Sequence, residues 1–477
     1  MIERLSKKGI RVALDAEEIL KNREDLIDAV LSLNKIFISR EDVEKILKEK
    51  EEKEKKEVEE KKPEVVVKKG EKPPEAKEYD PDIVIDHKRD ITGKSRTTGK
   101  VEDFIAYFRN RYKRMRRLFV STRTEYADAD IKELKNKDKK KVRIVGMVYK
   151  KSPTAKGNIL LIVEDLTGTF KVVIPRNNEK VFEEAKRIVK DDIIAFYGKV
   201  VNDLFIVDDF EWPGVPLMRE RKKSERNLEV AYLSDIHFGS NKFLSAPFEK
   251  FVNWLKKDER AGRIKYLIIA GDIVDGIGVY PNQEKELIVK DIEKQYEMFD
   301  DFVSALPDYI SVIVIPGNHD AVRRGEPMPA IGSDLIKSDV LSVGNPARVF
   351  IDGVSHIIYH GTSLDSFIAN IPKLSYTKPE EVMKEYLIRR HLSPFYGDNP
   401  IIPEEIDYMV IDEVPDILHV GHVHKNGYAD YRGTLLINSG TFQAQTEYQI
   451  KQGHVPTPGE IPIYNLKTGK LSTVKFA

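Results

Sequence analysis

The segment Leu267–Gly276 reads LIIAGDIVDG, an apolar run that stops at a glycine and then presents two carboxylates. A short continuous apolar run that ends at a turn signal is typical of a buried strand. In open α/β sheets, ligands bind beyond the carboxyl ends of the strands. The segment therefore predicts a strand that delivers Asp272 either to a solvated turn or to a charged ligand.

Four other strand ends between about Asn227 and Ala477 repeat this arrangement. They read VAYLSDIHFGS, VIVIPGNHD, HIIYHG and ILHVGHVH, and they present Asp235, His237, Asn318, His319, Asp320, His360, His422 and His424. Helical stretches alternate with these strands, which predicts an α/β domain. Each end alone is most often a turn or a core histidine, whereas five together predict one shared metal site. Imidazole and carboxylate ligands without cysteine suit Mn, Fe, Zn or Ni.

The series DIH, GDIVD, GNHD, YHG and GHVH resembles the five motifs of the calcineurin-like metallophosphoesterase superfamily, which has a four-layer αββα fold. The resemblance implies that Asp272 bridges two divalent ions, which activate a water for in-line attack on phosphorus. It assigns the other ligands to the two ions, namely Asp235, His237 and His424 to one and Asn318, His360 and His422 to the other. It makes His319 the group that neutralises the transition state or protonates the leaving oxygen, oriented by Asp320. Asp275 is either a supporting partner or a helix N-terminal charge.

Two regions precede this domain, which we place at residues 217–477. Residues 136–216 show three strands, a helix and two strands, the order of an OB-fold barrel, which serves single-strand binding and protein docking equally. Residues 81–135 form a connecting segment with a basic helix. Its apolar stripe consists of Phe104, Phe108, Tyr112, Met115 and Phe119, and the basic residues around it are Arg109, Arg111, Lys113, Arg114, Arg116 and Arg117. This pattern favours a docked helix with a solvated basic face over a nucleic-acid contact.

The N-terminal part is separate. Residues 1–48 show short helical patterns, with Ser39 at a helix start, and predict a small helical domain. Residues 49–80 are highly charged and low in complexity, which predicts a disordered linker.

Composition limits the classes of protein. The 477 residues contain 79 Lys and Arg, 79 Asp and Glu, and no cysteine. The net charge of the whole chain therefore gives no information about a nucleic-acid partner, whose signal would have to be local, and thiolate chemistry is excluded. No apolar run approaches the roughly 18 residues of a membrane span, and the N-terminus is too charged for a signal peptide. We expect a cytoplasmic protein without a membrane partner.

A barrel followed by a phosphoesterase domain resembles the B-type small subunits of replicative DNA polymerases, above all those of the archaeal D family. The segments that carry the likeness are LSDIHFGSNKF, GDIVDGIGVYPNQ, PGNHDAVRRGEPMPA, GHVHKNGY and NSGTFQAQTEYQ. The resemblance implies a 3′–5′ exonuclease that proofreads the DNA primer 3′ end in a heterodimer with a large catalytic subunit. It implies two divalent ions, usually Mn, with Fe, Zn, Ni or Mg as alternatives. The tethered N-terminal helices suggest recruitment of another replication factor.

Alternative functions are a repair nuclease of the Mre type, a small-molecule phosphatase or phosphodiesterase, and an inactive scaffold. Eukaryotic relatives that act as scaffolds have lost motif residues, whereas this chain keeps all the positions named as ligands and His319. Tyr280 could stack on a terminal base, and Arg323 and Arg324 could hold phosphate. The alternative for these three is a role as packed or solvated loop residues.

Overall fold

The computed structural model describes residues 74–120, 123–137 and 139–477, and in the N-terminal part residues 5, 11–13, 16, 19–20, 26–33, 35 and 37–48. The chain divides into two compact units, residues 1–72 and residues 73–477. Each unit is described by itself. Within the described residues, no helix combines the length and the apolar character that crossing a lipid bilayer requires.

The N-terminal unit is not purely helical. Strands β1 (Arg11–Val12) and β2 (Phe37–Ile38) pair in parallel, and helix α3 spans Ile27–Ser32. A further helix covers residues 40–48, and the predicted start at Ser39 is confirmed because the Asp42 carboxylate accepts hydrogen bonds from the Ser39 amide and hydroxyl. The prediction of an all-helical domain therefore missed this two-stranded sheet. Its strands are too short to produce a periodic pattern in the sequence.

The predicted linker ends earlier than expected. Residues 49–73 lie outside the described residues, whereas 74–80 pack on the main body. Ala76, in the 3-10 helix η2 (Glu75–Glu78), is fully buried, and the Asn227 side-chain amide donates to the Glu75 carboxylate. The predicted boundary at residue 80 is wrong, because one small apolar residue among charges is a weak signal.

The barrel has the predicted order of strands. Its elements are β5 (Lys141–Pro153), β6 (Ile159–Asp165), β7 (Gly168–Ile174), α6 (Glu179–Ala185), β8 (Ile193–Val201) and β9 (Leu204–Glu211). Neighbours run β5-β6-β7-β9-β8, and pairing of β5 with β8 closes the barrel. The short strand β4 (Ala127–Asp128) pairs in parallel with the start of β5, and the 3-10 helix η4 (Ile131–Asn136) precedes the barrel. Closure removes exposed strand edges.

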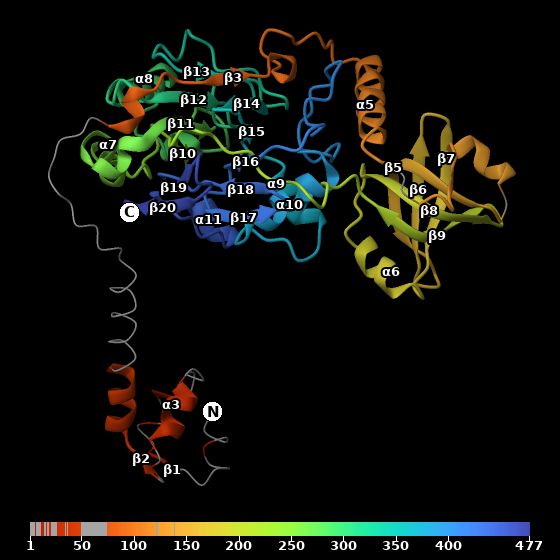
Figure 1. Ribbon diagram of the computed structural model, residues 1–477, viewed down its shortest axis with the longest axis horizontal. Coiled ribbons are helices and arrows are strands. Elements are labelled where there is room, and N and C mark those ends of the chain that lie inside the picture. The colour runs from red at the N-terminus through yellow and green to blue at the C-terminus, as the bar shows by residue number, and fades with distance from the viewer. Residues whose placement is uncertain are drawn as a thin grey trace. The chain divides into compact units, whose positions relative to one another are not determined.

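The α/β body contains two six-stranded sheets (Figure 1). The first has the order β13-β12-β11-β10-β19-β20, with strands Leu341–Ser342, Ser311–Ile315, Ile264–Ala270, Glu229–Leu233, Glu460–Asn465 and Leu471–Lys475. The second has the order β17-β18-β16-β15-β14-β3, with strands Gly427–Tyr431, Thr434–Asn438, Ile417–Val420, Val354–Tyr359, Ala347–Ile351 and Ile83–Ile85.

Strand β3 corrects a domain assignment. It lies within the predicted connecting segment 81–135, yet it pairs antiparallel with β14 at the edge of the second sheet. Three residues flanked by aspartates carry too little apolar signal to be read as a strand. The chain therefore contributes one strand to the α/β body before it forms the barrel. The 3-10 helix η3 (His87–Arg89) follows it.

The two sheets pack face to face between helices. Side chains such as Tyr232, Ile268 and Ile313 of the first sheet and Val349 and Ile358 of the second share one buried cluster. On the outer face of the first sheet lie α7 (Ser245–Lys257), η5 (Glu259–Arg263) and α8 (Ile292–Ser304), and on that of the second lie α9 (Leu364–Asn370) and α10 (Pro379–Arg389). The 3-10 helix η6 (Gln283–Lys285) lies between β11 and α8 in the chain. Helix α11 (Glu447–Gln452) lies near the C-terminus. This layering brings the carboxyl ends of β10, β11, β12, β15 and β16 to one region.

Helix α5 (Val101–Arg116) joins the barrel to the α/β body. The Tyr112 hydroxyl donates to the Val145 carbonyl of the barrel at 2.8 Å, and the Arg111 guanidinium pairs with Asp407 of the α/β body at 2.5 Å. The expectation of a docked helix is confirmed. Arg111 was expected on the exposed basic face but is only 1% exposed, because a single buried acceptor far along the sequence neutralises it.

A second buried contact fixes the barrel. The Arg389 guanidinium at the end of α10 donates to Asp192, next to β8, at 2.7 Å and to the Arg187 carbonyl at 2.7 Å. The Trp212 indole donates to the same Asp192 carboxylate at 3.2 Å. Asp192 and Arg389 are both almost fully buried. Charge-assisted bonds in a buried setting have strict geometry, so they specify one orientation of the two domains.

Buried histidines between the sheets predict a stability that depends on pH. The His356 imidazole donates to the Val354 carbonyl and accepts from the Tyr232 hydroxyl, and burial lowers its pKa to about 4. Because unfolded histidine titrates near 6.5, the unfolded chain binds a proton that the folded chain rejects. The stabilisation is complete above about pH 6.5 and is lost as the pH falls towards 4.

We expect wild type to lose about 2–3 kcal/mol between pH 7 and 4.5 that a His356→Gln variant does not lose. Urea unfolding at both pH values measures the difference. Parallel curves for the two proteins would contradict the assignment.

Candidate metal centre

The predicted ligands all sit directly beyond strand ends. Asp235 and His237 follow β10, and Asp272 follows β11. Asn318 follows β12, His360 follows β15, and His422 and His424 follow β16. Five of these residues have left-handed backbones, with φ of 52° at Asp235, 58° at His237, 50° at Asp272, 72° at His422 and 56° at His424. Such conformations are uncommon outside glycine and concentrate at functional sites.

Two glycines make the close approach of these loops feasible. A Cβ on Gly317 would lie 2.1 Å from the Asp272 Oδ1 atom, and a Cβ on Gly421 would lie 2.7 Å from the Asp235 Oδ2 atom. Only a residue without a side chain fits at these positions. The loops after β12 and β16 therefore press their backbones against the two carboxylates.

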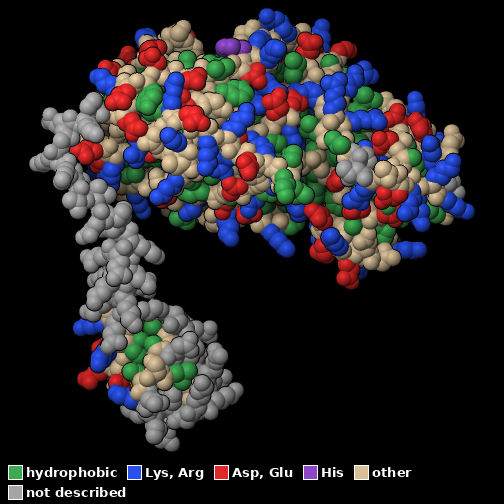
Figure 2. Space-filling model, viewed as in Figure 1, with side chains coloured by type: hydrophobic (Ala, Val, Ile, Leu, Met, Phe, Trp, Pro, Cys, Tyr) green, Lys and Arg blue, Asp and Glu red, His purple; other side chains and the backbone are tan. Residues whose placement is uncertain are grey.

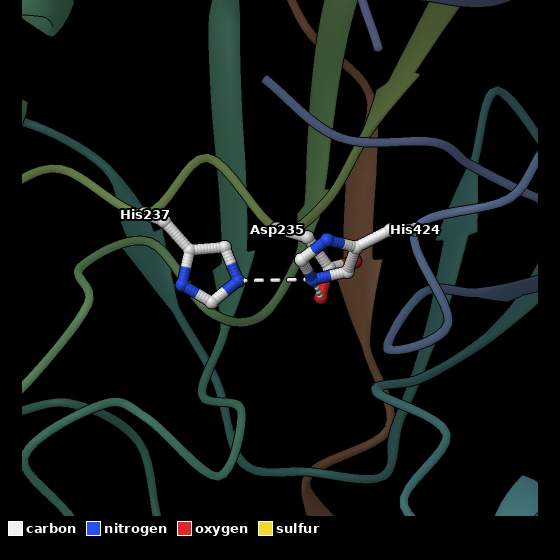
Figure 3. A group of neighbouring side chains, drawn as sticks. All are labelled: Asp235, His237 and His424. Carbon is white, nitrogen blue, oxygen red and sulfur yellow. Dashed lines mark hydrogen bonds and ion pairs between the residues drawn. The ribbon is translucent and has the colours of Figure 1, made fainter. Parts of the chain in front are cut away.

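One side of the centre contains Asp235, His237 and His424 (Figure 3). The Nε2 atoms of the two imidazoles lie 3.1 Å apart, and His424 Nε2 is 3.4 Å from Asp235 Oδ1. All three side chains are buried. Their ligand atoms converge on a common point, which is the arrangement that a metal ion needs.

The other side contains Asp272, His360 and His422. His360 Nε2 lies 3.3 Å from Asp272 Oδ2, 2.9 Å from Asn318 Oδ1 and 3.3 Å from His422 Nδ1. Asp272 Oδ2 is also 3.9 Å from His237 Nε2 on the first side. The Asp272 carboxylate thus stands between the two groups of ligands.

The donor set fits cations. Asp235 Oδ1 is buried without a hydrogen-bond partner in the part of the chain that the structure describes, although buried polar atoms are normally paired. Burial lowers the pKa of His237, but Asp275, Asp272 and Asp235 outweigh it and raise that pKa to about 9. Burial also lowers the pKa of His360, but the nearby carboxylates, Asp272 above all, outweigh it and raise that pKa to about 10. The carboxylates therefore favour positive charge here, which protons or metal ions can supply.

Outer partners orient the imidazoles. His237 Nδ1 donates to Asp275 at 3.0 Å, and His360 Nδ1 donates to the Ala270 carbonyl at 2.7 Å. Gln449 of α11 lies 2.8 Å from His424 Nδ1. These contacts direct the remaining ring nitrogens into the centre. Asp275 is only 1% exposed and is thus a supporting partner rather than a helix N-terminal charge.

Two partners escaped the sequence reasoning. Asp365 accepts from His422 Nε2 at 3.1 Å, and nothing in its local sequence marks it. Gln449 ends the segment NSGTFQAQTEYQ, so the family resemblance contains it but assigns it no role. Asp365 lies well before His422 in the chain, and Gln449 lies well after His424. Sequence periodicity gives no information about contacts between such distant residues.

His319 and Asp320 do not interact as expected. The His319 ring donates through Nδ1 to the Asp275 carbonyl at 2.8 Å, and its Nε2 lies 4.0 Å from Asp272 Oδ2. Asp320 instead accepts from the Gly317 amide at 2.8 Å and the Tyr296 hydroxyl at 3.2 Å. The expected orientation of His319 by Asp320 is wrong, because the Asp320 carboxylate points back into the turn and holds it together.

The loop residues considered for DNA contact lie around this centre. The ring of Tyr280 is 6.1 Å from the ring of His319, and its hydroxyl donates to Glu286. Arg323 pairs with the buried Glu404 carboxylate at 2.9 Å, which supports its structural alternative. The Arg324 side chain donates to the Gly278 carbonyl at 2.7 Å. Of these three side chains, that of Tyr280 is the one that lies beside His319 at the edge of the centre.

Comparisons with known proteins agree with this architecture. Residues 230–428 match the family model of the B-type subunit of DNA polymerase alpha/epsilon, and residues 142–210 match an OB-fold nucleic acid binding domain. The chain is 39% identical to the DNA polymerase II small subunit of Methanothermobacter thermautotrophicus, over 83% of this chain and 84% of that protein. It is 43% identical to that of Archaeoglobus fulgidus, over 79% and 78% of the two chains. Similarity at this level and coverage shows that the chain belongs to the family of archaeal DNA polymerase II small subunits, those of the D family.

Proposed function

We propose that this replicative polymerase subunit is a metal-dependent 3′–5′ exonuclease that hydrolyses DNA phosphodiesters and proofreads the primer 3′ end. The observation that carries the proposal is the Asp272 carboxylate, which stands between two buried groups of imidazole and carboxylate ligands. The two face-to-face sheets with outer helices support a calcineurin-like phosphoesterase domain. The family membership supports DNA as the substrate and a large catalytic subunit as the partner in a heterodimer.

Two divalent ions, with Mn as the expected metal, would share Asp272. Asp235, His237 and His424 would hold one ion, and Asn318, His360 and His422 would hold the other. When bound, such a pair lowers the pKa of water and neutralises phosphate charge. The Asp235 Oδ1 atom, which is buried and, among the described residues, has only the His424 ring nearby at 3.4 Å, and the carboxylates that raise the pKa of His237 support this assignment.

The chain's own groups would complete the chemistry. His319 lies at the rim of the centre with its Nδ1 proton on the Asp275 carbonyl, so its Nε2 atom faces the position beside Asp272. Burial lowers the pKa of His319. With its Nδ1 proton on the Asp275 carbonyl, the neutral ring has no proton at Nε2. It would donate one to the leaving 3′ oxygen after taking up a second proton, which the Asp272 and Asp275 carboxylates favour. Tyr280, beside His319, would stack on the terminal base.

A nuclease time course tests the proposal. Purified chain with Mn should shorten 3′-labelled and 5′-labelled single-stranded DNA stepwise from the 3′ end, and EDTA should stop the reaction. The same course with the large subunit added covers the case in which the chain needs its partner. No digestion in either form would contradict the proposal and favour a scaffold. Internal cutting, or hydrolysis only of small phosphoesters, would favour another phosphoesterase.

A further inference from the structure

The six basic side chains of helix α5 and its end fall into two sets. Three are neutralised by carboxylates, through the pairs Arg111–Asp407, Arg114–Asp412 and Arg116–Asp130. The other three, Arg109, Lys113 and Arg117, are exposed and make no side-chain ion pair or hydrogen bond with the residues that the structure describes. We call these three the α5 basic stripe. Carboxylates of the described residues therefore neutralise three of these six positive charges and leave the other three without an acidic partner.

The stripe has a regular geometry. Its members are four residues apart, so they lie on one face of the helix at intervals of about 6 Å along its axis. Arg111, on another face, is buried against Asp407 and prevents the helix from rotating. The stripe is thus held towards solvent. Lys and Arg side chains gather around the position of α5 on the face shown in Figure 2.

Two open grooves flank the C-terminal half of the helix. One, of about 310 Å³, is lined by Tyr112, Lys113, Arg116 and Arg117 of the helix and its end and by Leu166 of the barrel. The other, of about 540 Å³, is lined by Arg114, Arg117, Lys88 and Arg89 among others. The carboxylate that lines the second groove, Asp412, is already paired with Arg114. Both grooves therefore combine cationic side chains with apolar ones, such as Leu166 in the first and Leu118 and Ile406 in the second.

One stretch of chain lines the second groove and also contacts a loop that follows Asp320. Ile406 and Asp412 line the groove, and the same segment carries Glu404, which pairs with Arg323 in the loop after Asp320. Asp407 of this segment anchors α5. One stretch of chain thus contacts both the loop beside the centre and the basic helix.

We propose that the α5 basic stripe and its two grooves bind the phosphate backbone of single-stranded DNA. Regularly spaced cations without carboxylate partners, two of which, Lys113 and Arg117, line open grooves, complement a chain of regularly spaced phosphates without reading its bases. The whole chain has no net charge, so this local excess is not a by-product of a basic protein. An acidic protein segment is the competing occupant, and the experiment separates the two. This inference does not depend on nuclease activity.

Fluorescence anisotropy of a labelled 20-nucleotide single strand, in EDTA and at several KCl concentrations, tests the proposal. EDTA removes nuclease activity and any contribution of bound metal. The variant R109Q/K113Q/R117Q should bind at least about tenfold more weakly at low salt, with a salt slope smaller by about 2, since each phosphate contact contributes about 0.7 on single strands. The matched control K250Q/K256Q/K257Q removes three exposed charges from α7, at the other end of the α/β body (Figure 1).

The control should change affinity less than about twofold. Equal slopes for the stripe variant and wild type would overturn the proposal, and so would equal losses in both variants. Unchanged DNA binding together with failure to assemble with the large subunit would also overturn it, in favour of an acidic protein partner. All the substituted side chains are exposed, and equal thermal unfolding midpoints would verify the fold.

Discussion

Replacing Asp272 with asparagine is expected to lower the Mn-dependent exonuclease rate by roughly a thousandfold or more. The side chain keeps its volume, and the amide oxygen can still accept from the His319 backbone amide, now 2.8 Å from Oδ1. What is lost is the negative charge at Oδ2, which faces the His360 ring at 3.3 Å. Without that charge, the two groups of ligands no longer have a carboxylate between them that two cations could share.

The measurement pairs the reaction rate with the metal content of the dialysed protein. We expect wild type to retain about two Mn per chain and Asp272→Asn to retain fewer. Asp334→Asn, at an exposed position of the same domain, is the matched control and should behave as wild type. A variant that kept more than a tenth of the wild-type rate in a clean preparation would contradict the assignment of Asp272.

His319→Gln separates proton transfer from metal binding. Its ring lies at the edge of the centre and is directed by the Asp275 carbonyl. We expect a loss of about 10²–10⁴-fold in rate, as for removal of a general acid, with the Mn content unchanged. Parallel loss of metal would show that His319 acts as a ligand instead.

The centre was predictable because its information is local. Each ligand follows an apolar strand within a few residues, and the sheet topology then brings the strand ends together. Glycines before or beside the ligands gave a second local signal, and Gly317 shows its cause, a Cβ that would collide with Asp272. The order of strands in the barrel was predictable for the same reason, since alternation and turn residues mark each strand.

Contacts between distant segments were not predictable. Strand β3 joins its sheet through pairing with residues more than 250 positions away, and its own sequence is unremarkable. Asp320 looked like a partner of its neighbour His319, yet it binds Tyr296 on α8 and the turn at Gly317. Sequence adjacency suggested the wrong partner, because the tight turn directs consecutive side chains to opposite sides.

Among these contacts between distant segments, we expect the buried ion pair of Arg111 with Asp407 to contribute most to the free energy of unfolding. Asp407 accepts from Arg111 and from the His391 ring at 3.0 Å, and both acidic and guanidinium groups are almost fully buried. Burial alone would raise the pKa of Asp407, but Arg111 and His391 hold it well below its usual range. Arg111 also donates to the Pro394 carbonyl and the Tyr107 hydroxyl. Removing the carboxylate would strand a guanidinium inside the protein.

We therefore expect Asp407→Ala to lower the free energy of unfolding by about 3–5 kcal/mol, because an uncompensated buried charge costs more than the pair contributes. Urea unfolding measures the change. Asp412→Ala is the matched control, since Asp412 pairs with Arg114 of the same helix but is partly exposed. The expected loss there is at most about 1 kcal/mol.

A double variant distinguishes charge from packing. If the cost of Asp407→Ala arises from the stranded cation, R111M/D407L should recover much of the lost stability, because apolar groups of similar volume can replace a buried pair. The exposed stripe on the same helix would then keep its position, and DNA binding in EDTA should follow stability across these variants. Equal losses for the Asp407 and Asp412 substitutions would show that burial at 407 carries no special energy. In that case helix α5 would be held by its apolar contacts with the barrel, such as those of Tyr112 and Met115.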